Sequence, residues 1–190
     1  MKKRIIFIIA VIFVAFSVFA KEEKLHIKFC SEGIKFSIPF GRNYNYSDIK
    51  VKRVIDGDTL ELENGQRLRL IGIDAPEMHE SKKLYRDVQR TKKDIQTIKS
   101  MGRRSYEFLK NILENKRIRL EFDVERYDRY NRLLAYVFLK EDNTFVNAKM
   151  IEEGYAQPLT VPPNVKYADY FLTLFRKARQ EKKGLWAEEP

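Results

Sequence analysis

The sequence predicts an α+β protein in which five β-strands form a small barrel and about three helices pack around it. Three observations carry this prediction. Short segments of alternating apolar and polar residues recur between Ile49 and Phe122, an apolar run follows at Leu133–Leu139, and tight-turn signals such as Asn64-Gly65 separate the first segments. A segment with helical periodicity lies between the third and the fourth. Three strands, a helix and two further strands are the pattern of an OB-type barrel.

The expected strands cover residues 49–55, 59–62, 67–73, 118–122 and 133–139. The first three are joined by Asp56-Gly57 and Asn64-Gly65, which predicts a meander. Pro76 ends the third strand, because proline has no N–H to donate to a sheet. Tight connections of this kind place the ends of neighbouring strands close to one another.

Helical periodicity is clearest from Ser105 to Leu113 and from Tyr167 to Lys183. A shorter helix is expected from Asn147, as its N-cap, to Glu153, with a glycine as its C-terminal stop. Lys82 to Met101 is polar and is interpreted as a long charged loop with some helix. Pro158, Pro162 and Pro163 predict an extended loop.

The first 20 residues have the layout of a secretory signal peptide, with a positive start, an apolar run over residues 5–19 and a cleavage pattern after Ala20. The run is short for a membrane span, which needs about 20 apolar residues, so an uncleaved anchor is the alternative. Residues 21–47 are an extension whose alternation is consistent with a hairpin, and the main domain covers residues 48–188. We expect the protein to be secreted, or to be periplasmic or on the cell surface.

The composition is that of a folded, basic protein. Apolar residues make up 44% of the 190 residues, which excludes a disordered chain. Lys and Arg number 37 against 27 Asp and Glu, a formal net charge of +10, and loss of residues 1–20 with their three basic residues would leave 10 − 3 = +7. Such a surplus favours a polyanionic partner, either a nucleic acid or an anionic membrane surface. Cys30 is the only cysteine, so no internal disulfide holds the fold.

Acidic residues gather where the first three strands end. Asp58 and Asp74 stand at the ends of neighbouring strands, and two carboxylates at one point repel each other unless a cation lies between them. Oxygen ligands favour Ca²⁺ or Mg²⁺ over zinc. Glu77, held by the preceding Pro76, could orient or deprotonate a water molecule there. The alternative is that the Asp-Gly-Asp sequence at 56–58 only shapes a turn.

Arginines are the natural partners of a phosphate at such a site. Arg69 and Asp74 would face opposite sides of a regular strand, but Gly72 between them permits a bulge that turns one side chain. Farther along the chain, three arginines precede the fifth strand, and spacing alone does not select one of them for a phosphate contact: Arg126, Arg129 and Arg132.

Three segments together resemble the staphylococcal nuclease (thermonuclease) family: Asp56–Thr59, Arg69–Glu77 and Asp128–Tyr136. Their order and separation match, as does the final Gly184-Leu185-Trp186, and the resemblance runs from about residue 50 to residue 186. The resemblance implies a five-stranded OB barrel with three helices. It also implies Ca²⁺-dependent hydrolysis of phosphodiester bonds in DNA and RNA.

The resemblance implies roles for four residues of the acidic cluster. Asp58 and Asp74 match the family's metal carboxylates, and Ala75 matches a position that offers its backbone carbonyl to the metal. The family usually has threonine there, but a carbonyl ligand does not depend on the side chain. Glu77 matches the water-activating acid.

The remaining implied roles concern the substrate. Arg69 and Arg132 match two arginines that stabilise the transition state, and Tyr130 matches a tyrosine near the substrate. Lys82 and Lys83 fall where the family has a basic loop near the phosphate, in a segment that is longer here. Residues 160–164 lack the tyrosines that line the family's nucleotide pocket.

Two other classes of protein compete with the nuclease. A non-catalytic OB-fold protein would bind nucleic acid through basic and aromatic side chains without cutting it. A membrane-anchored adaptor would be held by residues 5–19. The nuclease hypothesis predicts DNA, RNA or both as substrate, a monomer, and no stable membrane partner if the signal peptide is cleaved.

Overall fold

The structure is a computed structural model that describes residues 44–187. The expected signal peptide, residues 1–20, and residues 21–43 of the expected extension lie outside the described residues, so cleavage after Ala20 stays a prediction. Within residues 44–187, no helix combines the length and the apolar character needed to cross a membrane.

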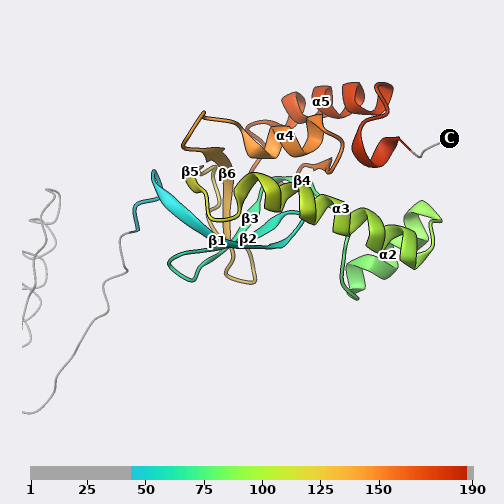
Figure 1. The fold of residues 1–190 in the computed structure, drawn as a ribbon, viewed down its shortest axis with the longest axis horizontal. Helices are drawn as coiled ribbons and strands as arrows, with labels where there is room; N and C mark the ends of the chain where they lie inside the picture. Colours follow the sequence, from blue (N-terminus) through green and yellow to red (C-terminus); the bar gives the residue numbers. More distant parts are fainter. Residues whose placement is uncertain (1–43, 188–190) are drawn as a thin grey trace, which may run out of the picture. The chain divides into compact units, whose positions relative to one another are not determined.

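Five strands close into a barrel, which confirms the OB-type prediction (Figure 1). They are β1 (Ile49–Asp56), β2 (Thr59–Leu62), β3 (Arg67–Leu70), β5 (Arg117–Glu121) and β6 (Leu133–Leu139), hydrogen-bonded in the order β1-β2-β3-β6-β5. The β3–β6 pair is parallel, and the other pairs are antiparallel. Antiparallel pairing of β5 with β1 closes the barrel.

The third expected strand is in fact two strands. β3 ends at Leu70, and Gly72 takes a φ of +78°, a value that favours glycine over any residue with a Cβ. The chain then leaves the barrel as β4 (Gly72–Asp74) and pairs with β7 (Gln157–Leu159). β7 lies in the segment that its prolines had marked as an extended loop. The break at Gly72 brings Asp74 back toward Arg69.

Four α-helices and one 3-10 helix occupy the described residues, against about three helices expected: α2 (Lys82–Thr91), α3 (Ile95–Leu113), α4 (Val146–Glu152), α5 (Ala168–Gln180) and η1 (Gly184–Trp186). The extra helix arises because the polar segment after residue 81 contains two N-caps. Ser81 Oγ accepts a hydrogen bond from Leu84 N–H at 3.1 Å, and Asp94 Oδ1 accepts one from Thr97 N–H at 2.9 Å.

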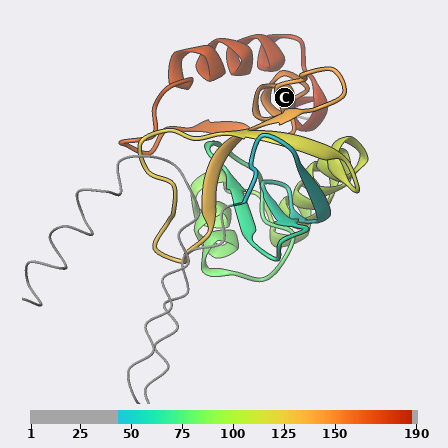
Figure 2. The ribbon, with the colours of Figure 1, turned by 90° about the vertical axis from the view of Figure 1, so that its left-hand side faces the viewer.

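The helices divide into two groups around the barrel. α4 and α5 lie on the same side of it in both views (Figures 1 and 2). α3 packs against β1 and carries α2 near its N-terminal end (Figure 1). The barrel interior is filled by fully buried aliphatic side chains such as Val51, Leu60 and Leu68. Packing of this core therefore fixes the positions of the strand ends, where the polar residues of the candidate site lie.

The expected N-cap of α4 was wrong. Phe145 precedes the helix without a side-chain cap, and Asn147 lies inside it with no exposed surface. The Asn147 amide accepts a hydrogen bond from Val137 N–H at 2.9 Å and donates one to Ile71 O at 2.8 Å. The Asn147 side chain therefore connects α4 to β6 and to Ile71, which lies between β3 and β4.

We expect Asn147→Ala to destabilise the protein strongly. The substitution leaves a buried N–H and a buried carbonyl without partners, and each such group costs roughly 1–3 kcal/mol. Urea unfolding at neutral pH would measure the loss. An unchanged unfolding midpoint would contradict the assigned bridging role.

Candidate active site

Arg69 lies between two carboxylates. Its Nη1 forms an ion pair with Asp58 Oδ2, and its Nη2 lies 3.2 Å from Asp74 Oδ1. Nη2 also donates to the carbonyl of Ile73 at 3.2 Å. All three ionic side chains are largely buried, with 13% or less of the side chain exposed. The guanidinium of Arg69 therefore links the turn between β1 and β2, where Asp58 lies, to the end of β4, where Asp74 lies.

Strand register explains why these residues meet. Thr59 pairs with Arg69 across β2 and β3, and Leu70 N–H donates to the carbonyl of Asp58 at 2.9 Å. Asp58 is thus beside Arg69 by hairpin geometry. The same carboxylate accepts hydrogen bonds from Thr59 Oγ1 at 2.9 Å and from Ala75 N–H at 3.2 Å. The hydrogen bond from Ala75 N–H connects the segment after β4 to the turn between β1 and β2.

A lysine from α2 completes the cluster. Lys83 Nζ lies 2.8 Å from Asp74 Oδ1 and 3.1 Å from Glu77 Oε1, and it donates to the carbonyl of Ala75 at 2.7 Å. Ala75 is itself buried, at 2% exposure. The backbone carbonyl and the two carboxylates therefore converge on one positive charge.

Glu77 is held in place from two sides. Its Oε2 accepts a hydrogen bond from Ser81 Oγ at 3.2 Å. α3 passes close to its backbone at Gly102, where a Cβ would lie 2.6–2.7 Å from the carbonyl group of Glu77. A glycine is needed for this approach, because real Cβ atoms do not come so near. The carboxylate is therefore presented by a backbone with little freedom to shift.

Electrostatics in the cluster follow from burial and pairing. Burial raises the pKa of Asp74, but Lys83 and Arg69 outweigh it and hold that pKa below its usual value. Burial lowers the pKa of the Arg69 guanidinium, and the positive charge of Arg132 acts in the same direction. Arg132 is thus close enough to Arg69 for the two charges to interact. Burial also raises the pKa of Asp56, which accepts a hydrogen bond from Gly57 N–H.

Arg132 is positioned by a tight loop between β5 and β6. Asp128 Oδ2 accepts a hydrogen bond from Arg132 Nε at 2.7 Å, and its Oδ1 accepts from the N–H groups of Tyr130 and Arg132 at 2.9 Å. The Tyr130 side chain is 65% exposed, and the guanidinium of Arg132 lies 5.6 Å from its ring centre. A hollow of about 540 Å³ opens here, lined by Arg67 together with Tyr130 and Arg132.

Asp128 should contribute to stability in a pH-dependent way. Burial raises its pKa, but its hydrogen bonds to Arg132 and Tyr130 outweigh burial and lower it. A carboxyl whose pKa is lower in the folded state stabilises the fold above its unfolded pKa of about 3.9. That contribution is lost as the pH falls through the folded pKa.

We therefore expect Asp128→Asn to be less stable than the unchanged protein at pH 7. The difference should shrink on acidification below about pH 4. Urea unfolding at several pH values would measure it. A stability difference that does not change with pH would show that the charge of Asp128 is not what matters.

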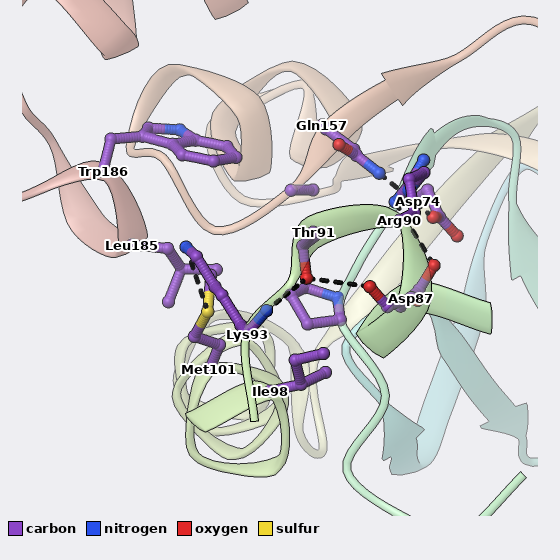
Figure 3. A pocket seen from close by; sticks show the side chains of 12 residues that line it. Asp74, Asp87, Arg90, Thr91, Lys93, Ile98, Met101, Gln157, Leu185 and Trp186 are labelled. Atoms are coloured by element: carbon purple, nitrogen blue, oxygen red, sulfur yellow. Dashed lines mark hydrogen bonds and ion pairs between the residues drawn. The ribbon is translucent and has the colours of Figure 1, made fainter. Parts of the chain in front are cut away.

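A second cavity adjoins Asp74 on the side of α2 (Figure 3). Its volume is about 250 Å³, and it lies between α2, α3, β7 and η1. Met101, Leu185 and Trp186 give it an apolar wall, while Arg90 and Gln157 lie near Asp74 (Figure 3). Gln157 Nε2 is 3.4 Å from Asp74 Oδ2, so β7 contributes a polar contact to the carboxylate.

The structure brings most of the residues singled out in the sequence into one place. Six of them form the cluster: Asp58, Arg69, Asp74, Ala75, Glu77 and Lys83. Arg132 stands beside it, Tyr130 borders the adjacent hollow, and Lys82 is exposed at the start of α2.

Sequence reasoning missed three supporting residues. Ser81 and Asp128 each had a detectable signal, because serine and aspartate are common at helix starts and tight turns. Gln157 had none, because it faces Asp74 only through the pairing of β4 with β7.

The barrel and its cluster define an OB-type protein with a polar site that joins carboxylates to arginines. The sequence model of a protein family described as "Staphylococcal nuclease homologue" matches residues 67–188 of this chain. A thermonuclease of Staphylococcus hyicus is 34% identical over 86% of this chain and 89% of its own length. A thermonuclease of Staphylococcus intermedius is 37% identical over 72% of this chain and 74% of its own. Endonuclease YncB of Bacillus subtilis is 31% identical over 74% of this chain and 62% of its own. The chain belongs to the staphylococcal nuclease family.

Proposed function

We propose that the protein is an exported, calcium-dependent nuclease that acts as a monomer and hydrolyses phosphodiester bonds of DNA, RNA or both. Relatives with the names thermonuclease and endonuclease place it among enzymes that hydrolyse nucleic acids. The observation that carries the mechanism is the guanidinium of Arg69 between Asp58 and Asp74, with Glu77 held beside them by Lys83.

The chain's own residues supply three parts of the chemistry. Glu77, fixed by Ser81 and by the close passage of α3, accepts the proton of a water molecule that attacks phosphorus. Arg69 and Arg132 donate to the phosphoryl oxygens on which negative charge grows. Burial of Arg69 and Asp74 excludes bulk water and strengthens these contacts.

The donor set fits a calcium ion. Asp58, Asp74 and the carbonyl of Ala75 offer oxygen atoms only, as hard cations prefer. The position of Lys83 is consistent with a cation site, because its ammonium contacts the oxygens of Asp74 and Ala75. A positive charge is therefore favoured at these oxygens. Over residues 44–187, no three His, Cys, Asp or Glu side chains gather closely enough to hold a metal by themselves, and a backbone carbonyl and water are further ligands that calcium accepts. When bound, calcium would offset negative charge on the phosphate.

A nucleic-acid substrate suits the surface beside the site. The chain carries a net charge of +10, and the hollow next to Arg132 combines Arg67 with the exposed ring of Tyr130. Cationic and aromatic side chains in one groove bind single strands through phosphates and stacked bases.

Cleavage of labelled single-stranded DNA and RNA by the purified protein would test the proposal. We expect cutting with added Ca²⁺ and none with a chelator. Cutting that persists in chelator would overturn the calcium dependence. Tight binding without cutting in either condition would favour the non-catalytic binding protein, which remains the alternative.

Export requires its own experiment. Cells that express the full chain would be fractionated, and the protein's N-terminus would be determined by mass spectrometry. We expect protein outside the cytoplasm that begins at Lys21. Full-length protein retained in the membrane fraction would favour an uncleaved anchor. On size-exclusion chromatography, an elution volume well below that of a monomer beginning at Lys21 would contradict the monomer.

A further inference from the structure

Lys83 occupies an unusual position for a lysine on a surface helix. Its ammonium makes contacts of 2.7 Å with the carbonyl of Ala75, 2.8 Å with Asp74 Oδ1 and 3.1 Å with Glu77 Oε1. Two of these oxygens belong to groups that fit calcium, and the third belongs to the proposed general base. An ammonium has three N–H donors and no acceptor, so it can satisfy three oxygens at once.

The first turn of α2 delivers this ammonium. Ser81 caps the helix and also donates to Glu77 Oε2 at 3.2 Å. Leu84 is fully buried and anchors the turn to the body of the protein. The neighbouring Lys82 is exposed, whereas only 20% of the Lys83 side chain is exposed. The helix start is therefore built around the acidic cluster, with one of two consecutive lysines directed into it.

We propose that Lys83 is a tethered counter-ion of the metal site, which holds Asp74, Ala75 and Glu77 together without calcium and must swing away before calcium binds them. The proposal rests on the calcium dependence proposed above. Lys83 and Arg69 already share Asp74 Oδ1, and a divalent cation at the same oxygens would add strong repulsion against the ammonium at such short range. Each binding event therefore disfavours the other.

Competition of this kind has two physical consequences. Calcium binds only the fraction of molecules in which Lys83 has left, so the measured affinity falls by that fraction. Without calcium, the ammonium acts together with Arg69 to offset the repulsion between the carboxylates, and it is the ionic partner of Glu77. The lysine thus lowers calcium affinity and stabilises the calcium-free fold at the same time.

Two neighbouring lysines allow a matched test. Lys83→Met removes the charge and keeps a long side chain, and Lys82→Met makes the same change one residue away on the exposed surface. Calorimetric titration with Ca²⁺ would measure affinity, and thermal melting in chelator would measure the calcium-free fold. For Lys83→Met we expect about tenfold tighter binding, which is about 1.4 kcal/mol. We also expect a lower melting temperature in chelator and a larger rise on adding calcium. Lys82→Met should leave the calcium affinity and the melting temperatures with and without calcium as they are in the unchanged protein.

A measurement on the unchanged protein covers the case in which Lys83→Met fails to fold. Acylation of lysine amines, read by mass spectrometry, should be slow at Lys83 in chelator and faster with Ca²⁺. The exposed Lys82 serves as the internal reference, with equal reactivity in both conditions.

Three results would overturn the proposal. Calcium affinity that is equal or weaker in folded Lys83→Met would mean that the ammonium does not compete with the cation. Equal acylation of Lys83 with and without calcium would mean that it is not displaced. Absence of calcium binding in the unchanged protein and in every variant would contradict the proposed calcium dependence itself. The first two results, by contrast, would contradict only the displacement of Lys83.

Discussion

Replacing Glu77 with glutamine is expected to slow phosphodiester cleavage by about 10²–10⁴-fold, the usual contribution of a general base. Glutamine has nearly the same shape, and Ser81 and Lys83 contact separate carboxylate oxygens at 3.2 and 3.1 Å. The glutamine carbonyl can accept from Lys83 while its NH2 group donates to the Ser81 hydroxyl. Glutamine cannot take a proton from water. The melting temperature should therefore change little while the rate falls.

Glu80→Gln provides the control for this experiment. Glu80 lies three residues away, its side chain is 70% exposed, and it pairs with Lys99 at 3.2 Å on the surface. Exposed pairs of this kind contribute little, so both cleavage and stability should remain as they were. Single-turnover cleavage of labelled DNA would compare the variants. Near-normal cleavage by folded Glu77→Gln would remove Glu77 from the mechanism.

The barrel could be predicted because its strands carry local signals. Alternation indicated β1, β2 and β5, a continuous apolar run indicated β6, and Asn64-Gly65 indicated the turn between β2 and β3. Hairpin geometry then implied that Asp58 and Asp74 would come together, and the structure places Arg69 between them, beside Asp58 through β2–β3 pairing. The possible turn at Gly72 was also visible, since a glycine stood where strict alternation would have separated Arg69 from Asp74.

Interactions that depend on tertiary placement could not be predicted in this way. Lys82 and Lys83 are identical residues in adjacent positions, and only the docking of α2 decides which one reaches the cluster. Asn147 resembled a helix cap because asparagine favours that position, but a buried amide between Val137 and Ile71 is determined by the packing of α4 on the barrel. At Lys83 and at Asn147, tertiary packing rather than local sequence propensity determines the contacts of the side chain.

The packing of Arg69 distinguishes it from the other arginine of the site. Arg69 pairs with Asp58 and Asp74 in a nearly closed environment, whereas Arg132 pairs with Asp128 at the base of an exposed loop. The sequence gives no reason to expect different effects on the fold from replacing the two. The structure does, because removing one partner of a buried ion pair leaves an uncompensated charge.

We expect Arg69→Ala to abolish cleavage and also to lower the free energy of unfolding by about 3–5 kcal/mol, as for other broken buried pairs. Arg132→Ala should lower cleavage by about 10²–10³-fold and leave most of the stability in place. Urea unfolding in chelator and in Ca²⁺ would measure both variants. Calcium should restore part of the stability of Arg69→Ala, because a cation at Asp58 and Asp74 would supply the positive charge that the substitution removes. Equal stability of the two variants in chelator would mean that Arg69 does not hold the carboxylates together, and the central contact of the site would then have to be reassigned.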